Sequence, residues 1–119
     1  MFGFVYVITN TSTMQRYIGK KQFWSNRTKR VKGRKNRKHY TIESDWKRYY
    51  GSCHELQADV QRLGVQHFAR TIVALCPTKA ALSYAEVEHQ IKADVLTATM
   101  HDGAPAFYNG NILNRFYRR

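Results

Sequence analysis

The sequence predicts a small α+β fold in which an antiparallel sheet of about three strands is covered by helices. Two short runs rich in β-branched and aromatic residues lie near the start of the chain, on either side of a polar turn. Two later segments have the apolar spacing of helices, and a third β-rich run lies between them. The 119 residues suit one core, so we expect a single domain over residues 1–119.

The first predicted elements form a hairpin. Residues 2–9 are rich in Phe, Val, Tyr and Ile, which are typical of strands. The letters "NTST" indicate a turn, and residues 16–19, extending as far as 23, form the return strand. Tyr6 and Tyr17 can therefore face one pocket, although strand tyrosines more commonly pack with their hydroxyls in water. Gly19 would allow the backbone to approach a phosphate closely.

The second half of the chain predicts helix, strand, helix and an extended tail. Residues 52–63 read as a helix, with Ser52 and Glu55 at the spacing of a capping box. Residues 68–76, "FARTIVALC", predict a third strand. Pro77 and Thr78 open a second helix that runs to about residue 96. The tail "FYNGNIL" reads as extended chain with Asn-Gly turn chemistry.

Positive charge is concentrated in one segment. Twenty Lys and Arg against eight Asp and Glu give a net charge of +12, and eight of those twenty cations lie within residues 27–40. Such a chain favours a polyanion through counterion release, and nucleic acid is the usual partner. The segment has few apolar residues to pack, so we expect an exposed loop or long hairpin over about residues 25–42. Trp24 and Trp46 flank it, and such tryptophans more often anchor a loop than stack on bases.

Several classes of function are disfavoured. No apolar run of about 18 residues exists, and the start lacks the features of a signal peptide, so we expect a cytoplasmic protein with no membrane partner. Cys53 and Cys76 are too few for a zinc cluster and are expected to be free, buried thiols. The histidines lack metal-ligand spacing; His54 is a candidate for a site, but a solvated side chain is the more common case.

The string "VYV", followed about ten residues later by "YIGK", resembles the GIY-YIG nuclease family. The likeness continues through "DWKRYYGS", "FARTIVALC", "LSYAEVEHQIKADVL" and "FYNGNI", and nearly the whole chain is similar to small phage-encoded, homing-type members. The resemblance implies the family's α+β fold with a basic insertion after the second strand. The first half of the motif departs from the usual pattern, because Phe4 and Val5 stand where Gly and Ile are frequent.

The resemblance also implies a catalytic set. That set is Tyr6, Tyr17, Lys20, Arg27, Glu86 and Asn109, with Glu86 holding the metal. Tyr17 is the first choice for the general base and Tyr6 the second, with Lys20 and Arg27 supplying a positive field that would favour the phenolate.

Alternatives stay open for several of these roles. Glu88 lies on the same predicted helix as Glu86 and borders the other apolar stripe, and Asn111 is the second asparagine of the tail. Lys47 and Arg48 are the substitutes for Arg27. A further histidine or tyrosine of the family pattern has no direct match at Val31, so Tyr40, Tyr49 and Tyr50 are candidates for that role.

Together these features predict an endonuclease that hydrolyses DNA, most readily double-stranded, with Mg²⁺ or Mn²⁺ on Glu86, and that acts as a monomer or homodimer. A non-catalytic basic nucleic-acid-binding protein and an RNA-cleaving enzyme are the alternatives. The residues expected to contact the DNA backbone are Lys21, Lys29, Arg30, Lys32, Arg34, Lys35, Arg37, Lys38, Lys47 and Arg48.

Overall fold

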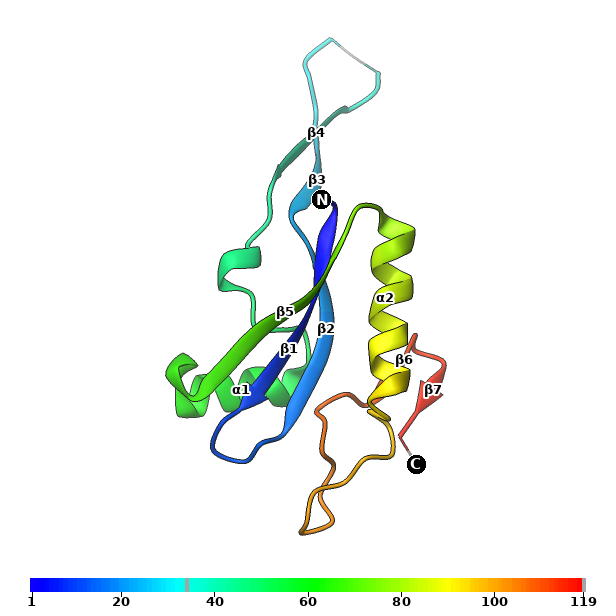
Figure 1. Cartoon of the computed structure of the whole chain (residues 1–119). Helices are drawn as coiled ribbons and strands as arrows, with labels where there is room; N and C mark the ends of the chain where they lie inside the picture. The colour runs from blue at the N-terminus through cyan, green and yellow to red at the C-terminus, as the bar shows by residue number, and fades with distance from the viewer. Residues whose placement is uncertain (34, 119) are drawn as a thin grey trace.

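The computed structural model describes residues 1–33 and 35–118 and shows strands and helices in the predicted α+β arrangement (Figure 1). The strands are β1 (Gly3–Asn10), β2 (Arg16–Gln22), β3 (Trp24–Lys29), β4 (Lys38–Glu43), β5 (Phe68–Cys76), β6 (Asn111–Ile112) and β7 (Phe116–Tyr117). The helices are α1 (His54–Leu63) and α2 (Lys79–Lys92), and the short 3-10 helices are η1 (Trp46–Arg48) and η2 (Val65–His67).

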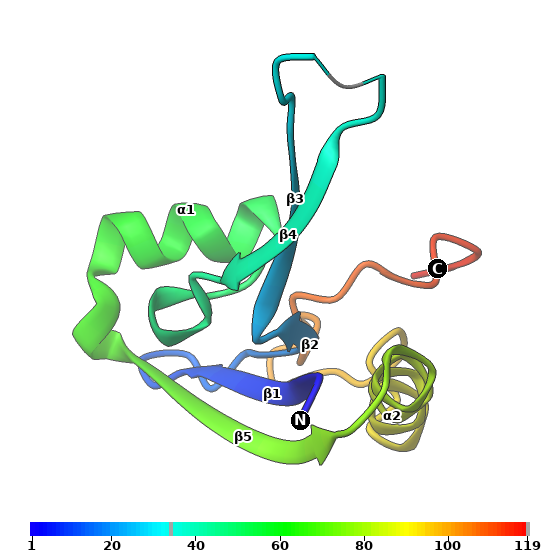
Figure 2. The ribbon, with the colours of Figure 1, turned by 90° about the horizontal axis from the view of Figure 1, so that it is seen from above.

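The central sheet has the strand order β2-β1-β5, with both neighbours antiparallel to β1. This confirms the predicted three-stranded antiparallel sheet. Successive side chains of a strand point to opposite faces, and both faces of β1 are covered. Phe4, Tyr6 and Ile8 pack with Leu56 of α1, whereas Val5 packs with Leu82 of α2. Figure 2 shows α1 and α2 lying well apart around the sheet.

The helices are shorter than predicted. Cys53 precedes α1 and makes no side-chain capping bond, so the predicted capping box of Ser52 and Glu55 is wrong. At α2, Thr78 is the N-cap, and its hydroxyl accepts a hydrogen bond of 3.1 Å from the Ala81 amide. The helix ends at Lys92, and a positive φ of 53° at Asp94 follows, because the chain turns there toward the tail.

The tail lies against the outer edge of β2. The Tyr108 amide donates to the Arg16 carbonyl at 2.7 Å, and the Arg16 amide donates to the Ala106 carbonyl at 3.0 Å. The tail therefore covers an edge strand that would otherwise expose unpaired backbone groups. The tight turn of the tail occurs at Leu113 and Asn114, both with positive φ, and the predicted turn at the Asn-Gly pair is wrong.

The basic segment forms the two-stranded hairpin β3–β4, which projects from the body (Figure 1). Nearly every residue of its two strands is exposed. Trp46 anchors the base of the hairpin, with its ring centroid 5.0 Å from that of Phe23, whereas Trp24 is 54% exposed. The hairpin matches one of the two predicted forms; that it is an insertion relative to related chains stays a prediction.

Candidate functional site

A polar cleft of about 780 Å³ lies where β2, α2, the start of α1 and the tail meet. Strand β2 contributes Tyr17 and Lys20, α2 contributes Glu86, and the tail contributes Asn109. Four of the six predicted catalytic residues therefore line one cavity, although up to 92 positions separate them in sequence. Pairing of β2 with the tail, and packing of α2 on the sheet, bring them together.

The two tyrosines occupy different depths. The rings of Tyr6 and Tyr17 lie 6.2 Å apart between centroids, but Tyr6 is 1% exposed and does not line the cleft. Burial, followed by the neighbouring phenols Tyr17 and Tyr49, raises the pKa of Tyr6 far above its ordinary value. Of these two phenols, Tyr17 is the one that lines the cleft.

Burial also raises the pKa of the Tyr17 phenol, and a hydrogen bond with Ser52 partly offsets this effect. The neighbouring groups Cys53, Glu86 and Tyr49 raise the pKa of Tyr17 further, so the positive field expected to favour the phenolate is not among the effects that shift this group.

The rings of Tyr6 and Tyr17 leave no space for a side chain at Gly19. A Cβ at this position would lie 2.7 Å from Tyr6 Cζ and 2.8 Å from Tyr17 Cε2, closer than real contacts allow. Gly19 lies opposite Tyr6 in the β1–β2 register, so its missing side chain leaves room for both rings. The physical reason for this glycine is ring packing, where the sequence alone suggested close approach to a phosphate.

Glu86 faces the cleft and Lys20. Its carboxylate has a side-chain exposure of 17%, and its Oε1 lies 3.8 Å from Lys20 Nζ, which also donates to Ser83 Oγ at 3.0 Å. Burial raises the pKa of the Glu86 carboxyl, and the charge of Lys20 opposes that shift.

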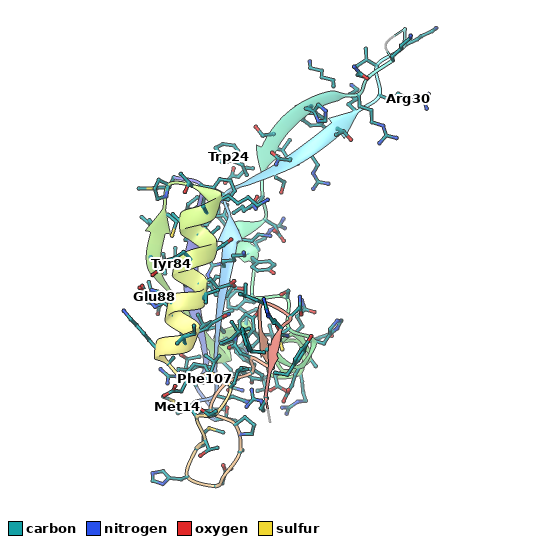
Figure 3. The ribbon with its side chains drawn as sticks, turned by 90° about the vertical axis from the view of Figure 1, so that its right-hand side faces the viewer. Met14, Trp24, Arg30, Tyr84, Glu88 and Phe107 are labelled. Carbon is teal, nitrogen blue, oxygen red and sulfur yellow. The ribbon has the colours of Figure 1, made fainter. Side chains whose placement is uncertain are left out.

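Glu88 does not line the cleft. Its carboxylate is 42% exposed and lies 3.8 Å from Lys92 Nζ on the same helix. Figure 3 shows Glu88 and Tyr84 labelled along α2.

Asn109 and Gln90 hold β2 by its backbone. Asn109 Oδ1 accepts from the Ile18 amide at 3.0 Å, and Asn109 Nδ2 donates to the Ile18 carbonyl at 2.8 Å. Gln90 Nε2 donates to the same carbonyl at 3.1 Å. The clamp on Ile18, formed by Asn109 and Gln90, fixes the strand between Tyr17 and Gly19. Sequence reasoning missed Gln90, although it follows Glu86 by four residues and so shares its helical face.

The structure does not bring Arg27 into the cleft. Strand β2 ends at Gln22, and the chain passes directly into β3, where Arg27 is exposed opposite Tyr40. An extended strand advances about 3.3 Å per residue, so the hairpin carries Arg27 away from Lys20. Arg30, at the hairpin tip, lies farther still from α2 (Figure 3). The lysine of the described cleft lining is Lys20.

The loop at the start of α1 forms another wall of the cleft. Ser52, Cys53, His54 and Glu55 all line it. Both cysteines are free thiols, as expected, but only Cys76 is buried; Cys53 is partly exposed at the cleft. Of these wall residues, His54 alone is a site candidate from the sequence.

The predicted DNA-contacting residues fall into two groups. Lys21 Nζ lies 2.7 Å from Asp45 and 3.9 Å above the Tyr49 ring, and its hydrogen bond lowers the pKa of the Asp45 carboxyl. Lys47 Nζ lies 3.5 Å from Glu43, while Arg48 is exposed in η1. The remainder lie in the hairpin or at its tip, except that Arg34 lies outside the described residues; they are Lys29, Arg30, Lys32, Lys35, Arg37 and Lys38.

The residues of the cleft suit a hard divalent cation. Mg²⁺ is commonly held by one or two carboxylates, with water and substrate phosphate completing its shell. Glu86 offers one partly buried carboxylate, with the Lys20 ammonium 3.8 Å away. Within residues 1–33 and 35–118 no group of three or more His, Cys, Asp and Glu side chains is placed to hold a metal ion, so the fit is to an open site rather than a closed cage.

No described helix is long and apolar enough to cross a membrane.

Comparison with known proteins gives one family. Residues 1–112 match the family described as "Putative endonuclease segE, GIY-YIG domain". No curated protein and no solved structure gives a significant match to the chain. The match covers both strands that carry the tyrosines, the whole of α2 and Asn109.

Proposed function

The chain belongs to the GIY-YIG endonuclease family, and on that premise we propose that it is a Mg²⁺- or Mn²⁺-dependent endonuclease that hydrolyses phosphodiester bonds of double-stranded DNA. The observation that carries this proposal is the shared cleft of Tyr17, Lys20, Glu86 and Asn109. Family membership supports nuclease chemistry on DNA; the cleft supports the assignment of individual residues.

Glu86 is the proposed metal ligand. A bound divalent ion would neutralise charge on the scissile phosphate and on the leaving oxygen. The partly buried position of Glu86 makes its lone negative charge costly in the absence of a cation. The charge of Lys20, 3.8 Å away, opposes the rise in the pKa of that carboxyl and would add positive charge at the place where the phosphate would lie.

Tyr17 is the proposed general base. In its phenolate form it accepts a proton from the attacking water, whose oxygen bonds to phosphorus as a bridging P–O bond breaks. Tyr6 is 1% exposed, so its proposed role is to pack behind Tyr17 and hold that ring against Gly19. Because burial raises the pKa of Tyr17, the phenolate is a minority form at neutral pH and the rate should rise with pH.

Asn109 and Gln90 act as positioning residues. Their hydrogen bonds to the Ile18 amide and carbonyl fix the backbone of β2 between Tyr17 and Lys20. The directions of these two side chains are fixed as a result. Catalytic groups displaced by about 1 Å lose much of their effect. The tail therefore contributes to the site through Asn109, which holds the backbone of β2.

The hairpin β3–β4 and its tip supply the proposed DNA grip. A cluster of cations raises the rate of encounter with a polyanion and contacts phosphates without regard to sequence. Arg27 takes part here, on β3, rather than in the chemical step. A cut through both strands would need two copies of the chain, as a homodimer, or two successive nicks.

Cleavage of supercoiled plasmid tests the proposal. Wild-type protein with Mg²⁺ should nick or linearise the plasmid, and chelator should stop the reaction. Glu86→Gln should reduce cleavage by at least about 100-fold while DNA binding is retained, because no phosphate contact is removed. Glu88→Gln is the matched control, since it removes an exposed glutamate from the same helix, and it should cleave like wild type.

Three outcomes contradict the proposal in different ways. Equal cleavage by Glu86→Gln and wild type would refute the metal site. Binding without cleavage by wild type, with every divalent ion tried, would indicate the non-catalytic basic binder. Cleavage of RNA in preference to duplex DNA would indicate the RNA-cleaving alternative.

A further inference from the structure

The hairpin β3–β4 carries two chemically different faces. Residues paired across an antiparallel ladder share a face, and successive pairs alternate between faces. One face holds the pairs Arg27↔Tyr40 and Lys29↔Lys38. The opposite face holds Asn26↔Thr41 and Thr28↔His39, and at the base of the hairpin Trp24↔Glu43, whose carboxylate is paired with Lys47. We call the four residues of the first face the cationic face and the four residues Asn26, Thr28, His39 and Thr41 the neutral face, and all eight are exposed.

The cationic face lacks internal partners. Lys29 and Lys38 lie directly opposite each other, an arrangement that destabilises a free ladder. Among the described residues, no Lys or Arg between positions 24 and 43 forms an ion pair with a carboxylate. A two-stranded hairpin without a packed face is also only marginally stable in water. An external polyanion would relieve the repulsion and favour the ordered ribbon.

The neutral face has the side chains that read base edges. Asn forms two hydrogen bonds with adenine, Thr contacts either base type or the thymine methyl group, and both are short. Short side chains reach bases only when their own face lies on the floor of a groove. The longer Lys and Arg side chains of the other face can extend around the ribbon to the phosphates on the groove walls.

We infer that the β3–β4 hairpin is a β-ribbon that enters the DNA major groove, where its neutral face, centred on Asn26 and Thr41, selects sequence while its cationic face contacts phosphates. The major groove, about 12 Å wide, admits a two-stranded ribbon. The inference rests on the proposed DNA-cleaving function and adds a specificity determinant to it. The partner it names is B-form duplex DNA.

Selection from a random pool of duplex DNA tests the ribbon by binding alone. The full chain carrying Glu86→Gln is mixed with the pool, and the bound sequences are determined. We expect a preference at a few neighbouring base pairs. In the same background, Asn26→Ala with Thr41→Ala should reduce that preference by about 5- to 150-fold, the discrimination of a good base contact. The salt dependence of binding should not change.

The matched variant is Lys29→Gln with Lys38→Gln on the cationic face. It should weaken binding to all sequences alike and lower the slope of log K against log salt by about 0.9 for each phosphate that the variant no longer binds. The sequence preference should survive. Both pairs are exposed and outside the core, so thermal unfolding should match the parent protein and exclude misfolding as the cause.

Several results would overturn the ribbon. They are an absence of any preference, a preference that survives Asn26→Ala with Thr41→Ala, and a preference that disappears with the lysine pair. Equal preference for the same sequence as duplex RNA would also overturn it, because the deep, narrow major groove of RNA does not admit side chains. Plasmid cleavage without sequence preference would refute the ribbon but leave the proposed nuclease intact. Sequence-selective binding by the wild-type protein without cleavage would support the ribbon but refute the proposed nuclease.

Discussion

Replacing Asn109 by alanine should remove the two hydrogen bonds that the tail makes with the backbone of Ile18. Asn109 is 4% exposed, and its side chain makes hydrogen bonds of 3.0 and 2.8 Å to the amide and carbonyl of Ile18. The Ile18 carbonyl would keep its bond from Gln90, but the Ile18 amide would lose its partner in a residue only 4% exposed. The substitution therefore leaves the buried Ile18 amide without a hydrogen-bond acceptor, while the Ile18 carbonyl keeps its hydrogen bond from Gln90.

The expected magnitude follows from that count. An unpaired buried donor costs about 1–3 kcal/mol, and removal of the second hydrogen bond about 1 kcal/mol. Asn109→Ala should then lower the free energy of unfolding by roughly 2–4 kcal/mol, which for a chain of this length is a fall in Tm of about 8–16 °C. Gln90→Ala should cost less, about 1–2 kcal/mol, because Asn109 still satisfies the Ile18 carbonyl.

Urea unfolding and amide exchange measure this effect. Asn26→Ala, which removes an exposed asparagine of β3, is the control and should stay within about 0.5 kcal/mol of wild type. The Ile18 amide should lose protection from hydrogen exchange in Asn109→Ala alone. The reasoning fails if Asn109→Ala is as stable as the control, or if Gln90→Ala is the more damaging of the two.

Three further predictions concern the cleft. Because burial raises the pKa of Glu86, its ionised form is disfavoured in the folded protein, and the stability this group contributes is lost as pH rises through its folded pKa. Glu86→Gln should therefore be more stable than wild type at pH 8, with the difference gone below pH about 4; urea unfolding at both values checks this, and a less stable variant at pH 8 contradicts it. Gly19→Ala should cost about 1–3 kcal/mol, because its Cβ meets both phenol rings, whereas Gly110→Ala, with nothing within 4 Å, should be nearly neutral in the same unfolding assay. Finally, log kcat/KM for cleavage should climb with a slope near one between pH 6 and 9, since burial raises the pKa of Tyr17; a flat profile would exclude Tyr17 as base.

Local patterns predicted most of the fold. Residues 68–76 form β5 at the expected bounds, and the two tyrosine strands pair as a hairpin. These elements were predictable because alternation and β-branched residues act over a few neighbours. The helix starts were less accurate. At α1, Ser52 and Glu55 have the spacing of a capping box, but the N-cap is Cys53, which makes no side-chain capping bond, and Glu55 lies in the first turn of the helix.

The resemblance named four residues that line one cleft, whereas the direction of a helix side chain and the path of the hairpin depend on tertiary packing that spacing does not show. Periodicity alone did not separate Glu86 from Glu88; packing of α2 on the sheet turns Glu86 to the cleft and leaves Glu88 paired with Lys92. The offset from Gly19 placed Arg27 in the site, yet the strand that follows β2 carries it out along a separate hairpin. The number of residues between Gly19 and Arg27 does not show whether the chain folds back toward the cleft after β2 or continues away from it.

The separation between cleft and ribbon has a geometric consequence for the proposed enzyme. Lys20 and Asn26 are six residues apart in nearly continuous extended chain, so about 20 Å separates their backbones at most. Duplex DNA rises about 3.4 Å per base pair, so the bases read by the neutral face would lie within about six base pairs of the bond cut in the cleft. The cleft is held by buried packing and by the clamp on Ile18, whereas the ribbon has almost no core of its own. If the ribbon reads sequence as proposed, substitutions on it should change the site of cleavage without disturbing the residues proposed to carry out the chemistry.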